Sequence, residues 1–191
     1  MIVLVIGPSG SGKGTQAELL AKKLGVPALS MGQLMRDEMQ SNTDLGKKLS
    51  GYLSQGLFTP TELTLETLTP ELEKHPGGFV LDGFPRRLEN LTKLEEYLHN
   101  KNRKIDKIIY LKIADEEAVK RLTKRAEVDK QTTGLARHDD TDEVIRQRLQ
   151  SFHETIDPIL PYAREKGYLE EVDGERSVEE IHQQIMARLN G

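Results

Sequence analysis

The chain contains no cysteine and no tryptophan, and aromatic residues make up only 5% of its 191 residues. Without cysteine it can form neither disulfide bonds nor zinc–thiolate sites, which fits a reducing compartment. No apolar run approaches the roughly 18 residues that would suggest a transmembrane helix. The first residues also lack the charged start and the small-residue cleavage site of a signal peptide. We therefore expect a cytoplasmic protein.

Neither sign of charge dominates the sequence. The formal net charge is −4, so the chain has no general attraction for nucleic acid or for an anionic membrane. Charged residues make up 30% and hydrophobic residues 36%, which suits one domain with a hydrated surface. We expect no nucleic-acid or membrane partner, and the polar composition favours a monomer.

A glycine-rich segment, residues 7–16, directly follows the apolar run of residues 2–6. The pattern predicts a strand, a loop and a helix, in which inward-pointing N–H groups form an anion site at the helix N-terminus. Lys13 can then reach nucleotide phosphates and Thr15 offers a hydroxyl near bound magnesium, although Gly14 interrupts the strict motif. The alternative is a flexible linker, but linkers do not join a buried strand to an amphipathic helix. The residues expected to bind the donor phosphates are Gly10, Ser11, Gly12, Lys13, Gly14 and Thr15.

Further apolar runs indicate the rest of a sheet. Strands are expected at residues 2–6, 78–81, 107–111 and 168–172, with a weaker candidate at 26–29. The helical patterns between them are long enough for crossovers, which predicts an α/β fold with a parallel sheet covered on both faces.

Three helix starts carry capping signals. Thr59 is a candidate N-cap with Pro60 at the first helical position. Ser30 with Gln33, and Ser177 with Glu180, have the spacing of a capping box.

Two stretches interrupt the alternation of strands and helices. Residues 30–59 contain two helical segments and no strand, as an insertion would. Residues 126–136 are polar and aperiodic between two helices, which predicts either a disordered loop or a moving flap.

The segment Leu-Asp-Gly-Phe-Pro-Arg at 81–86 follows the predicted third main strand. Carboxyl ends of strands in such a sheet open onto the ligand crevice. There Asp82 can orient magnesium-bound water and Arg86 can hold an anion. An ordinary turn is the alternative reading.

Four arginines flank residues 126–136. Arg121 and Arg125 share a helix face before this segment, while Arg137 and Arg148 follow it. Each alone is typical of a solvated surface charge. Together they favour phosphate contacts, because a guanidinium binds phosphate oxygens bidentately and remains charged.

The motifs in their order resemble the nucleoside monophosphate kinases of the adenylate kinase family, from the glycine-rich loop to the final helix. The matching motifs are Gly-Lys-Gly-Thr-Gln at 12–16, Ser-Met-Gly-Gln-Leu-Met-Arg at 30–36, Asp-Gly-Phe-Pro-Arg at 82–86, Arg-His-Asp-Asp at 137–140 and Val-Asp-Gly at 172–174. The resemblance implies a phosphate-loop, three-layer fold with a five-stranded parallel sheet. It also implies a helical monophosphate-binding insertion at 30–59 and a short lid at 126–136, within a single kinase domain of residues 1–191.

The resemblance further implies transfer of the γ-phosphoryl group of ATP to a nucleoside monophosphate. Magnesium would accompany ATP, held through water near Asp82 and Thr15 without a direct protein ligand. The expected catalytic residues are Lys13, Asp82, Arg86, Arg125, Arg137 and Arg148. Besides the loop, Arg121, Arg125 and Arg176 would bind ATP. The acceptor nucleotide would contact Met31, Arg36, Leu57, Phe58, Thr59, Gly83, Phe84, Pro85, Arg86, Asn90, Arg137 and Arg148.

Two positions leave the acceptor base open. Adenine-specific members of the family carry threonine where this chain has Met31 and glutamine where it has Asn90, whereas relatives that phosphorylate UMP and CMP have alanine and asparagine. We expect AMP as the acceptor, with a UMP/CMP kinase as the alternative. A non-catalytic nucleotide-binding module is disfavoured by the retained arginines. Kinases of non-nucleotide acceptors are disfavoured by the motif at 82–86.

Overall fold

The computed structural model describes residues 1–54, 59–133 and 142–189, with the backbone alone at 126, 128–133 and 142. Along the chain the elements are β1 (Ile2–Ile6), α1 (Lys13–Leu24), β2 (Ala28–Ser30), α2 (Met31–Gln40), α3 (Asp44–Leu53), α4 (Thr61–Glu73), β3 (Phe79–Asp82), α5 (Leu88–Asn100), β4 (Lys107–Lys112), α6 (Asp115–Thr133), α7 (Asp142–Ile156), α8 (Ile159–Glu165), β5 (Leu169–Asp173) and α9 (Val178–Leu189).

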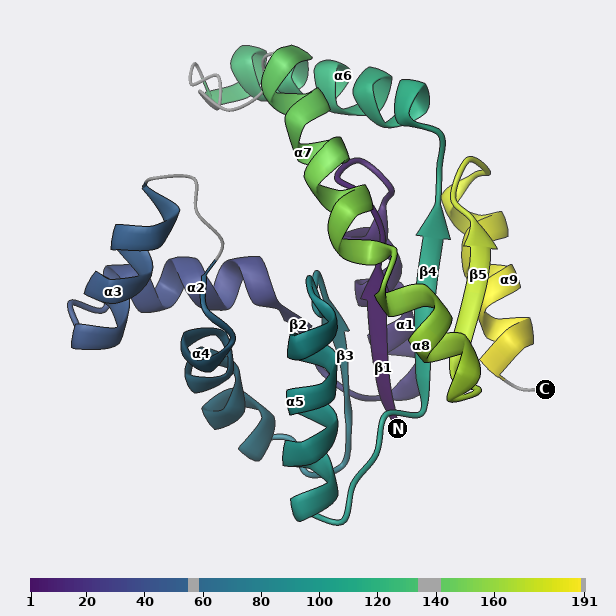
Figure 1. Ribbon diagram of the computed structural model, residues 1–191. Coiled ribbons are helices and arrows are strands. Elements are labelled where there is room, and N and C mark those ends of the chain that lie inside the picture. The colour runs from purple at the N-terminus through teal and green to yellow at the C-terminus, as the bar shows by residue number, and fades with distance from the viewer. Residues whose placement is uncertain (55–58, 134–141, 190–191) are drawn as a thin grey trace.

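The strands form one five-stranded parallel sheet in the order β2-β3-β1-β4-β5 (Figure 1). Ile2 pairs with Phe79 on one side of β1, and Val3 pairs with Lys107 on the other. All five predicted strands are confirmed: β1 has the predicted boundaries, and those of the other four shift by at most two residues. The strand order reverses around β1, so the loop after β1 opens at the point where parallel sheets bind ligands.

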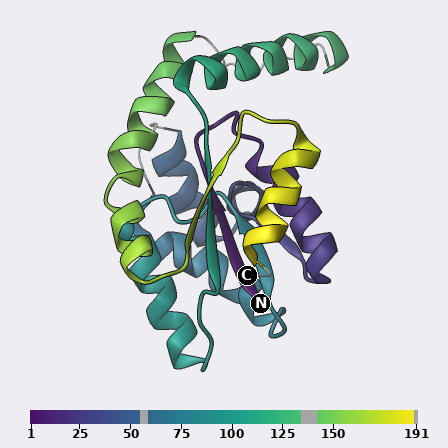
Figure 2. The same ribbon diagram turned by 90° about the vertical axis from the view of Figure 1, so that its right-hand side faces the viewer.

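Helices cover both faces of the sheet, as Figure 2 shows edge-on. Alternate residues of β1 belong to different cores: Ile2, Leu4 and Ile6 pack in the cluster with α5 and α8, whereas Val3 and Val5 pack in the cluster with α1 and α9. Every residue of β1 is buried. This explains why its sequence is continuously apolar rather than alternating. The predicted three-layer α/β fold is confirmed.

The insertion predicted at 30–59 contains helices α2 and α3; apart from Ser30, which ends β2, none of its described residues lies in a strand. These helices touch closely at Gly46, where a Cβ atom would lie 2.2 Å from the Glu38 carbonyl oxygen. The Thr43 hydroxyl caps α3 by accepting a hydrogen bond from the Gly46 amide. A glycine is therefore required for α3 to fold back against α2.

The loop predicted over residues 126–136 is wrong for most of its length. Helix α6 continues to Thr133, so residues 126–133 are helical, and 134–136 lie outside the described residues. The segment lacks apolar periodicity, but it also contains no glycine or proline before Gly134. Its alanine, glutamate, lysine and glutamine residues have high helix propensity, which allows α6 to continue.

The capping predictions have mixed outcomes. Ser177 and Glu180 form the predicted capping box, because each side chain accepts a hydrogen bond from the other residue's amide. Ser30 is the N-cap of α2 but makes no capping side-chain bond. Helix α4 begins at Thr61 with Pro60 as its N-cap, one residue later than predicted from Thr59. No helix in the described parts of the chain is both long and apolar enough to span a bilayer.

Glu95 connects α5 to α8 and to the residue before β5. Its carboxylate accepts hydrogen bonds of 2.6 Å from the hydroxyls of Tyr162, on α8, and Tyr168, just before β5. The bond to Glu95 raises the pKa of Tyr162 to about 12, and burial followed by the Glu95 bond raises the pKa of Tyr168.

We expect Glu95→Gln to lower the free energy of unfolding by about 1–2 kcal/mol, because two charge-assisted hydrogen bonds are weakened. Above pH 10 the folded wild type retains these tyrosine protons more strongly than the unfolded chain, so its stability falls as the pH rises towards 12, and the variant should show a shallower fall. Urea unfolding between pH 7 and pH 11 measures both effects. Glu96→Gln, which removes only an exposed pair with Lys93, should change stability by less than about 0.5 kcal/mol.

Candidate active site

The loop between β1 and α1 leaves a helix N-terminus open. Gly10 and Gly12 have φ angles of 86° and 83°, in the left-handed region that favours glycine. At Gly10 a Cβ atom would also lie 3.0 Å from the Ala118 carbonyl oxygen, so the loop packs closely on α6. Gly12 is the N-cap of α1 and provides no side-chain hydrogen bond. The first amides of α1 are therefore available to an anion.

Lys13 begins α1 and lies at the centre of a cluster of charges. Its Nζ atom donates a 3.2 Å hydrogen bond to the Pro8 carbonyl oxygen, which folds the side chain back over the loop. Burial lowers the pKa of Lys13; Asp82 opposes this shift, whereas the positive charges of Arg86 and Arg125 add to it. An anion bound among these cations would relieve their mutual repulsion.

Asp82 ends β3 directly beside the loop. Its Oδ2 atom lies 3.5 Å from where a Cβ atom of residue 14 would be, so Gly14 brings the helix backbone against the carboxylate. The Oδ1 atom is buried and has no hydrogen-bond partner among the described residues, and the same holds for the Ser11 hydroxyl. Burial raises the pKa of Asp82, and the charges of Lys13 and Arg86 oppose the rise.

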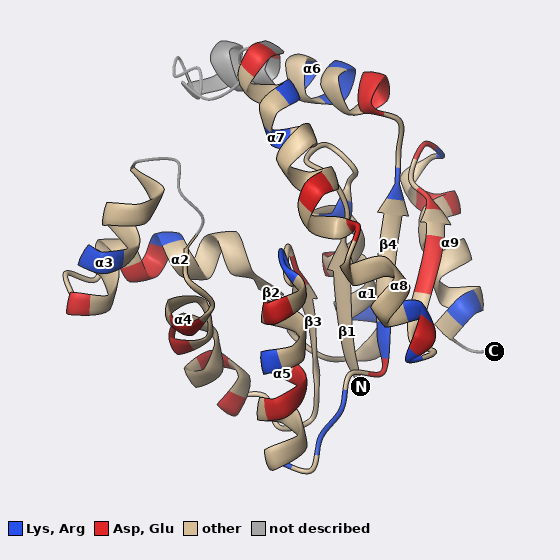
Figure 3. Cartoon of the chain, viewed as in Figure 1, with Lys and Arg blue, Asp and Glu red and all other residues tan. Residues whose placement is uncertain are grey.

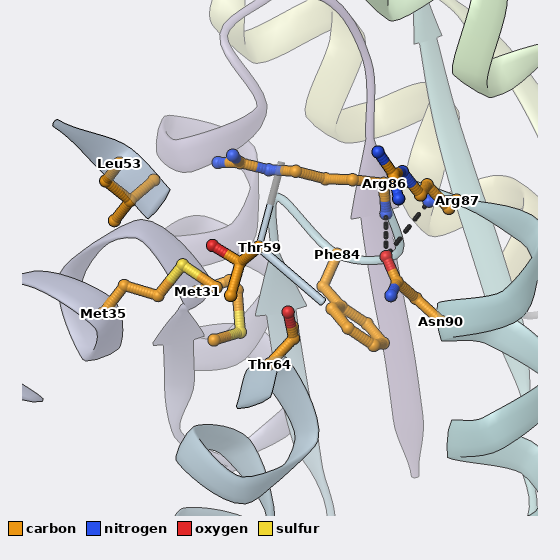
Figure 4. Close-up of a pocket in the computed structure, with 9 residues that line it drawn as sticks. All are labelled: Met31, Met35, Leu53, Thr59, Thr64, Phe84, Arg86, Arg87 and Asn90. Atoms are coloured by element: carbon orange, nitrogen blue, oxygen red, sulfur yellow. Dashed lines mark hydrogen bonds between the residues drawn. The ribbon is translucent and has the colours of Figure 1, made fainter. Parts of the chain in front are cut away.

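Arg86 extends across the mouth of a small cavity, as Figure 4 shows. Its Nε atom donates to the Gly83 carbonyl oxygen at 3.3 Å, and the peptide bond between Phe84 and Pro85 is cis. Although the Arg86 side chain is exposed in the cleft, desolvation by the surrounding protein lowers the pKa of its guanidinium; Asp82 opposes this shift and Arg148 adds to it. Arg148 on α7 is thus electrostatically coupled to Arg86 on the loop after β3.

The cavity beneath Arg86 has a mainly apolar wall. It is lined by Met31, Met35, Leu53, Thr59, Thr64, Phe84, Arg86, Arg87 and Asn90. Five of these residues were expected from the sequence. Met35, Leu53, Thr64 and Arg87 were missed, although Met35 lies one turn after Met31 on α2 and could have been found by that spacing. The arrangement suits a planar apolar group, with a charged group held at the mouth.

Three further predicted arginines, Arg36, Arg121 and Arg176, each bond to residues near them. Arg36 on α2 donates to Gln33 at 2.7 Å. Arg121 is fixed by Glu117 at 2.7 Å and by the Gly174 carbonyl at 2.8 Å, which brings α6 to the end of β5. Arg176 pairs with Asp173 at 3.2 Å. Figure 3 shows basic positions on α2, α6, α7 and the loop after β3.

The predicted residues form two groups around one space. The loop, Lys13 and Asp82 lie at the switch point of the sheet, and the cavity with Arg86 at its mouth lies next to them. Such a site can hold an anionic group between two ligands, surrounded by cations that stabilise charge as it moves. Leu57, Phe58 and Arg137, which the sequence also predicted, lie outside the described residues.

Comparison with known proteins gives one family. A family model described as "Adenylate kinase" matches residues 5–168. The chain is 37% identical over 191 residues to a protein named adenylate kinase from Thermobifida fusca, covering 99% of this chain and 98% of that protein. It is similarly 34% identical to an adenylate kinase from Archaeoglobus fulgidus, with 99% and 98% covered. An adenylate kinase from Corynebacterium urealyticum is 36% identical, with 100% and 99% covered.

Proposed function

This chain belongs to the adenylate kinase family, and we propose that it transfers the γ-phosphoryl group of ATP to AMP, forming two ADP. The observation that carries the proposal is the juxtaposition at the sheet's switch point. An uncapped helix N-terminus with Lys13 lies beside an apolar cavity that has Arg86 at its mouth. One part suits a polyphosphate and the other a base with a phosphate attached.

On the donor side, the amides of residues 10–15 and Lys13 bind the ATP phosphates. Arg121 packs against the ATP base, together with the backbone near Arg176. The hydrogen bond from Arg121 to the Gly174 carbonyl oxygen and the ion pair of Arg176 with Asp173 support this assignment, because they hold both guanidinium groups at the end of β5.

On the acceptor side, Arg36 and Arg86 bind the AMP phosphate and the cavity residues enclose the base. Arg125, Arg137 and Arg148 gather around the transferred group. Coulombic coupling of Arg125 to Lys13 and of Arg148 to Arg86 supports the grouping. The acceptor phosphate oxygen attacks in line, and positioning with electrostatic stabilisation accounts for catalysis without a covalent enzyme intermediate.

Magnesium would enter with ATP, near Asp82 and Thr15 and through water. The residues fit it, because the buried Oδ1 atom of Asp82 has no hydrogen-bond partner among the described residues and the Thr15 side chain is exposed beside the loop. When bound, the ion would neutralise phosphate charge.

We also propose that residues 30–59 form the AMP-binding insertion and residues 126–136 a short lid, both closing over the ligands to exclude water. Helices α6 and α7 extend beyond the carboxyl edge of the sheet, which supports a covering role (Figure 1). The protein would act as a cytoplasmic monomer, with ATP and AMP as its partners.

A coupled assay of ADP formation from ATP with AMP, CMP, UMP, GMP and dTMP tests the proposal. We expect AMP to be the best acceptor, with measurable activity on CMP or UMP, because Met31 and Asn90 replace the residues that select adenine in the family. Loss of one discriminating hydrogen bond changes selectivity by about tenfold. A higher kcat/KM for CMP or UMP than for AMP would instead make the protein a UMP/CMP kinase. Absence of ADP with every acceptor would overturn both.

A further inference from the structure

The side chain of Asn90 makes three hydrogen bonds within the protein. Its Oδ1 atom accepts hydrogen bonds from the amides of Arg86, at 3.3 Å, and Arg87, at 3.1 Å (Figure 4). Its Nδ2 atom donates to the Thr61 hydroxyl at 3.0 Å. Asn90 is only 4% exposed. Both lone pairs of the amide oxygen are therefore used, and one N–H remains.

These hydrogen bonds conflict with recognition of an adenine base by the Asn90 amide. A side-chain amide distinguishes adenine by accepting one hydrogen bond and donating another. To accept from a base, Asn90 would have to release a backbone amide of the Arg86 loop. Leaving that partly buried amide unpaired offsets what the new hydrogen bond gains.

The network reaches from the Arg86 loop to the end of the insertion. The Thr61 hydroxyl, which accepts from Asn90, donates in turn to the Glu89 carboxylate at 2.8 Å. Thr61 begins α4, and Asn90 and Glu89 lie in the first turn of α5. Asn90 therefore links the starts of two helices to the backbone that carries Arg86.

We propose that Asn90 is a positioning residue for Arg86 and does not select the acceptor base; this rests on the proposed function, in which Arg86 holds the acceptor phosphate. Asn90 fixes the backbone from which the guanidinium extends over the cavity. A small displacement of a group that orients the acceptor is costly in turnover, because the phosphate oxygen must lie in line with the group transferred. The base is then distinguished by the shape of the wall that Met31, Met35 and Leu53 provide.

The test compares Asn90→Ala, Asn90→Asp and Thr61→Val with the wild type, using AMP and CMP as acceptors. Asn90→Ala should lower kcat about tenfold for both acceptors and leave the AMP-to-CMP ratio of kcat/KM within about twofold. Asn90→Asp should restore most of kcat, because a carboxylate can accept from both amides and suits the first turn of α5. Thr61→Val should give a smaller loss with the same unchanged ratio. Circular dichroism at the assay temperature checks that each variant is folded.

Thr92→Val is the matched control, because Thr92 lies on the same helix and bonds only to the Glu89 carbonyl among the described contacts. It should leave both acceptors unaffected. A change of tenfold or more in the AMP-to-CMP ratio for Asn90→Ala would overturn the proposal and make Asn90 a base-reading residue. Unchanged kcat in that variant would overturn it too.

Amide hydrogen exchange at Arg86 and Arg87 separates this proposal from the proposed function. In the protein without nucleotide, Asn90→Ala should speed exchange at both amides about tenfold or more, because their acceptor is lost. If the wild type phosphorylated no nucleoside monophosphate, the proposed function would fail while faster exchange would still support the bonding role of Asn90. If exchange were unchanged in an active enzyme, the positioning role alone would fail.

Discussion

Replacement of Lys13 by methionine should reduce kcat by a factor of about 10²–10³ with every acceptor, since it removes a cation aimed at the transferred charge. Methionine keeps the length and the apolar stem of the side chain. The measurement is the initial rate of ADP formation at saturating ATP and AMP, with KM determined for each.

The same change should leave the protein at least as stable as the wild type. Burial and the charges of Arg86 and Arg125 lower the pKa of Lys13, so the folded state carries an unfavourably placed cation that methionine eliminates. Lys22→Met, on the exposed side of α1, is the control and should retain full activity. A Lys13→Met enzyme within tenfold of wild-type turnover would remove Lys13 from the catalytic residues.

Arg86→Ala is expected to lower kcat/KM for AMP by about 10²–10³ while changing KM for ATP only a few fold. Its guanidinium extends over the cavity mouth, on the acceptor side of the site, so its loss affects the acceptor and the transition state rather than donor binding. Steady-state kinetics with each substrate varied in turn separates these effects.

Arg86→Lys should recover only part of the loss, because an ammonium keeps the charge but not the planar fork that binds two phosphate oxygens. Arg164→Ala, which breaks a surface ion pair with Glu171, provides the control and should behave as wild type. Near-native turnover of Arg86→Ala at saturating AMP would contradict the role assigned to Arg86.

Most of the sheet could be predicted from the sequence because its physical cause is local. A buried parallel strand such as β1 must be continuously apolar, and the glycines that follow it mark the turn into α1. Parallel pairing and helices on both faces then follow from crossovers long enough to contain a helix, whereas the strand order β2-β3-β1-β4-β5 was known only from the structure. The boundaries depend on the pairing of neighbouring strands, and those of every strand but β1 differ from the prediction by at most two residues.

Two features could not be predicted, for different reasons. Helix α6 continues through residues without apolar periodicity, so the expected pattern was absent although helix propensity was high. The bonds of Asn90 depend on Thr61, 29 residues away, and on the backbone after β3. No spacing in the sequence indicates that the side-chain oxygen of Asn90 already accepts two hydrogen bonds.

Helices α6 and α7, here called the α6–α7 arm, pack partly through apolar contacts of their own. Ile113, Ala118, Leu122, Ile145 and Leu149 form a cluster of their own, separate from the two clusters that cover the sheet. Changes in the length of the connection between α6 and α7 therefore leave the packing of the sheet intact. The junctions suited to exchange between related chains lie after β4 and after Leu149, because Phe152 and Ile156 at the end of α7 already pack in the cluster with α5 and α8.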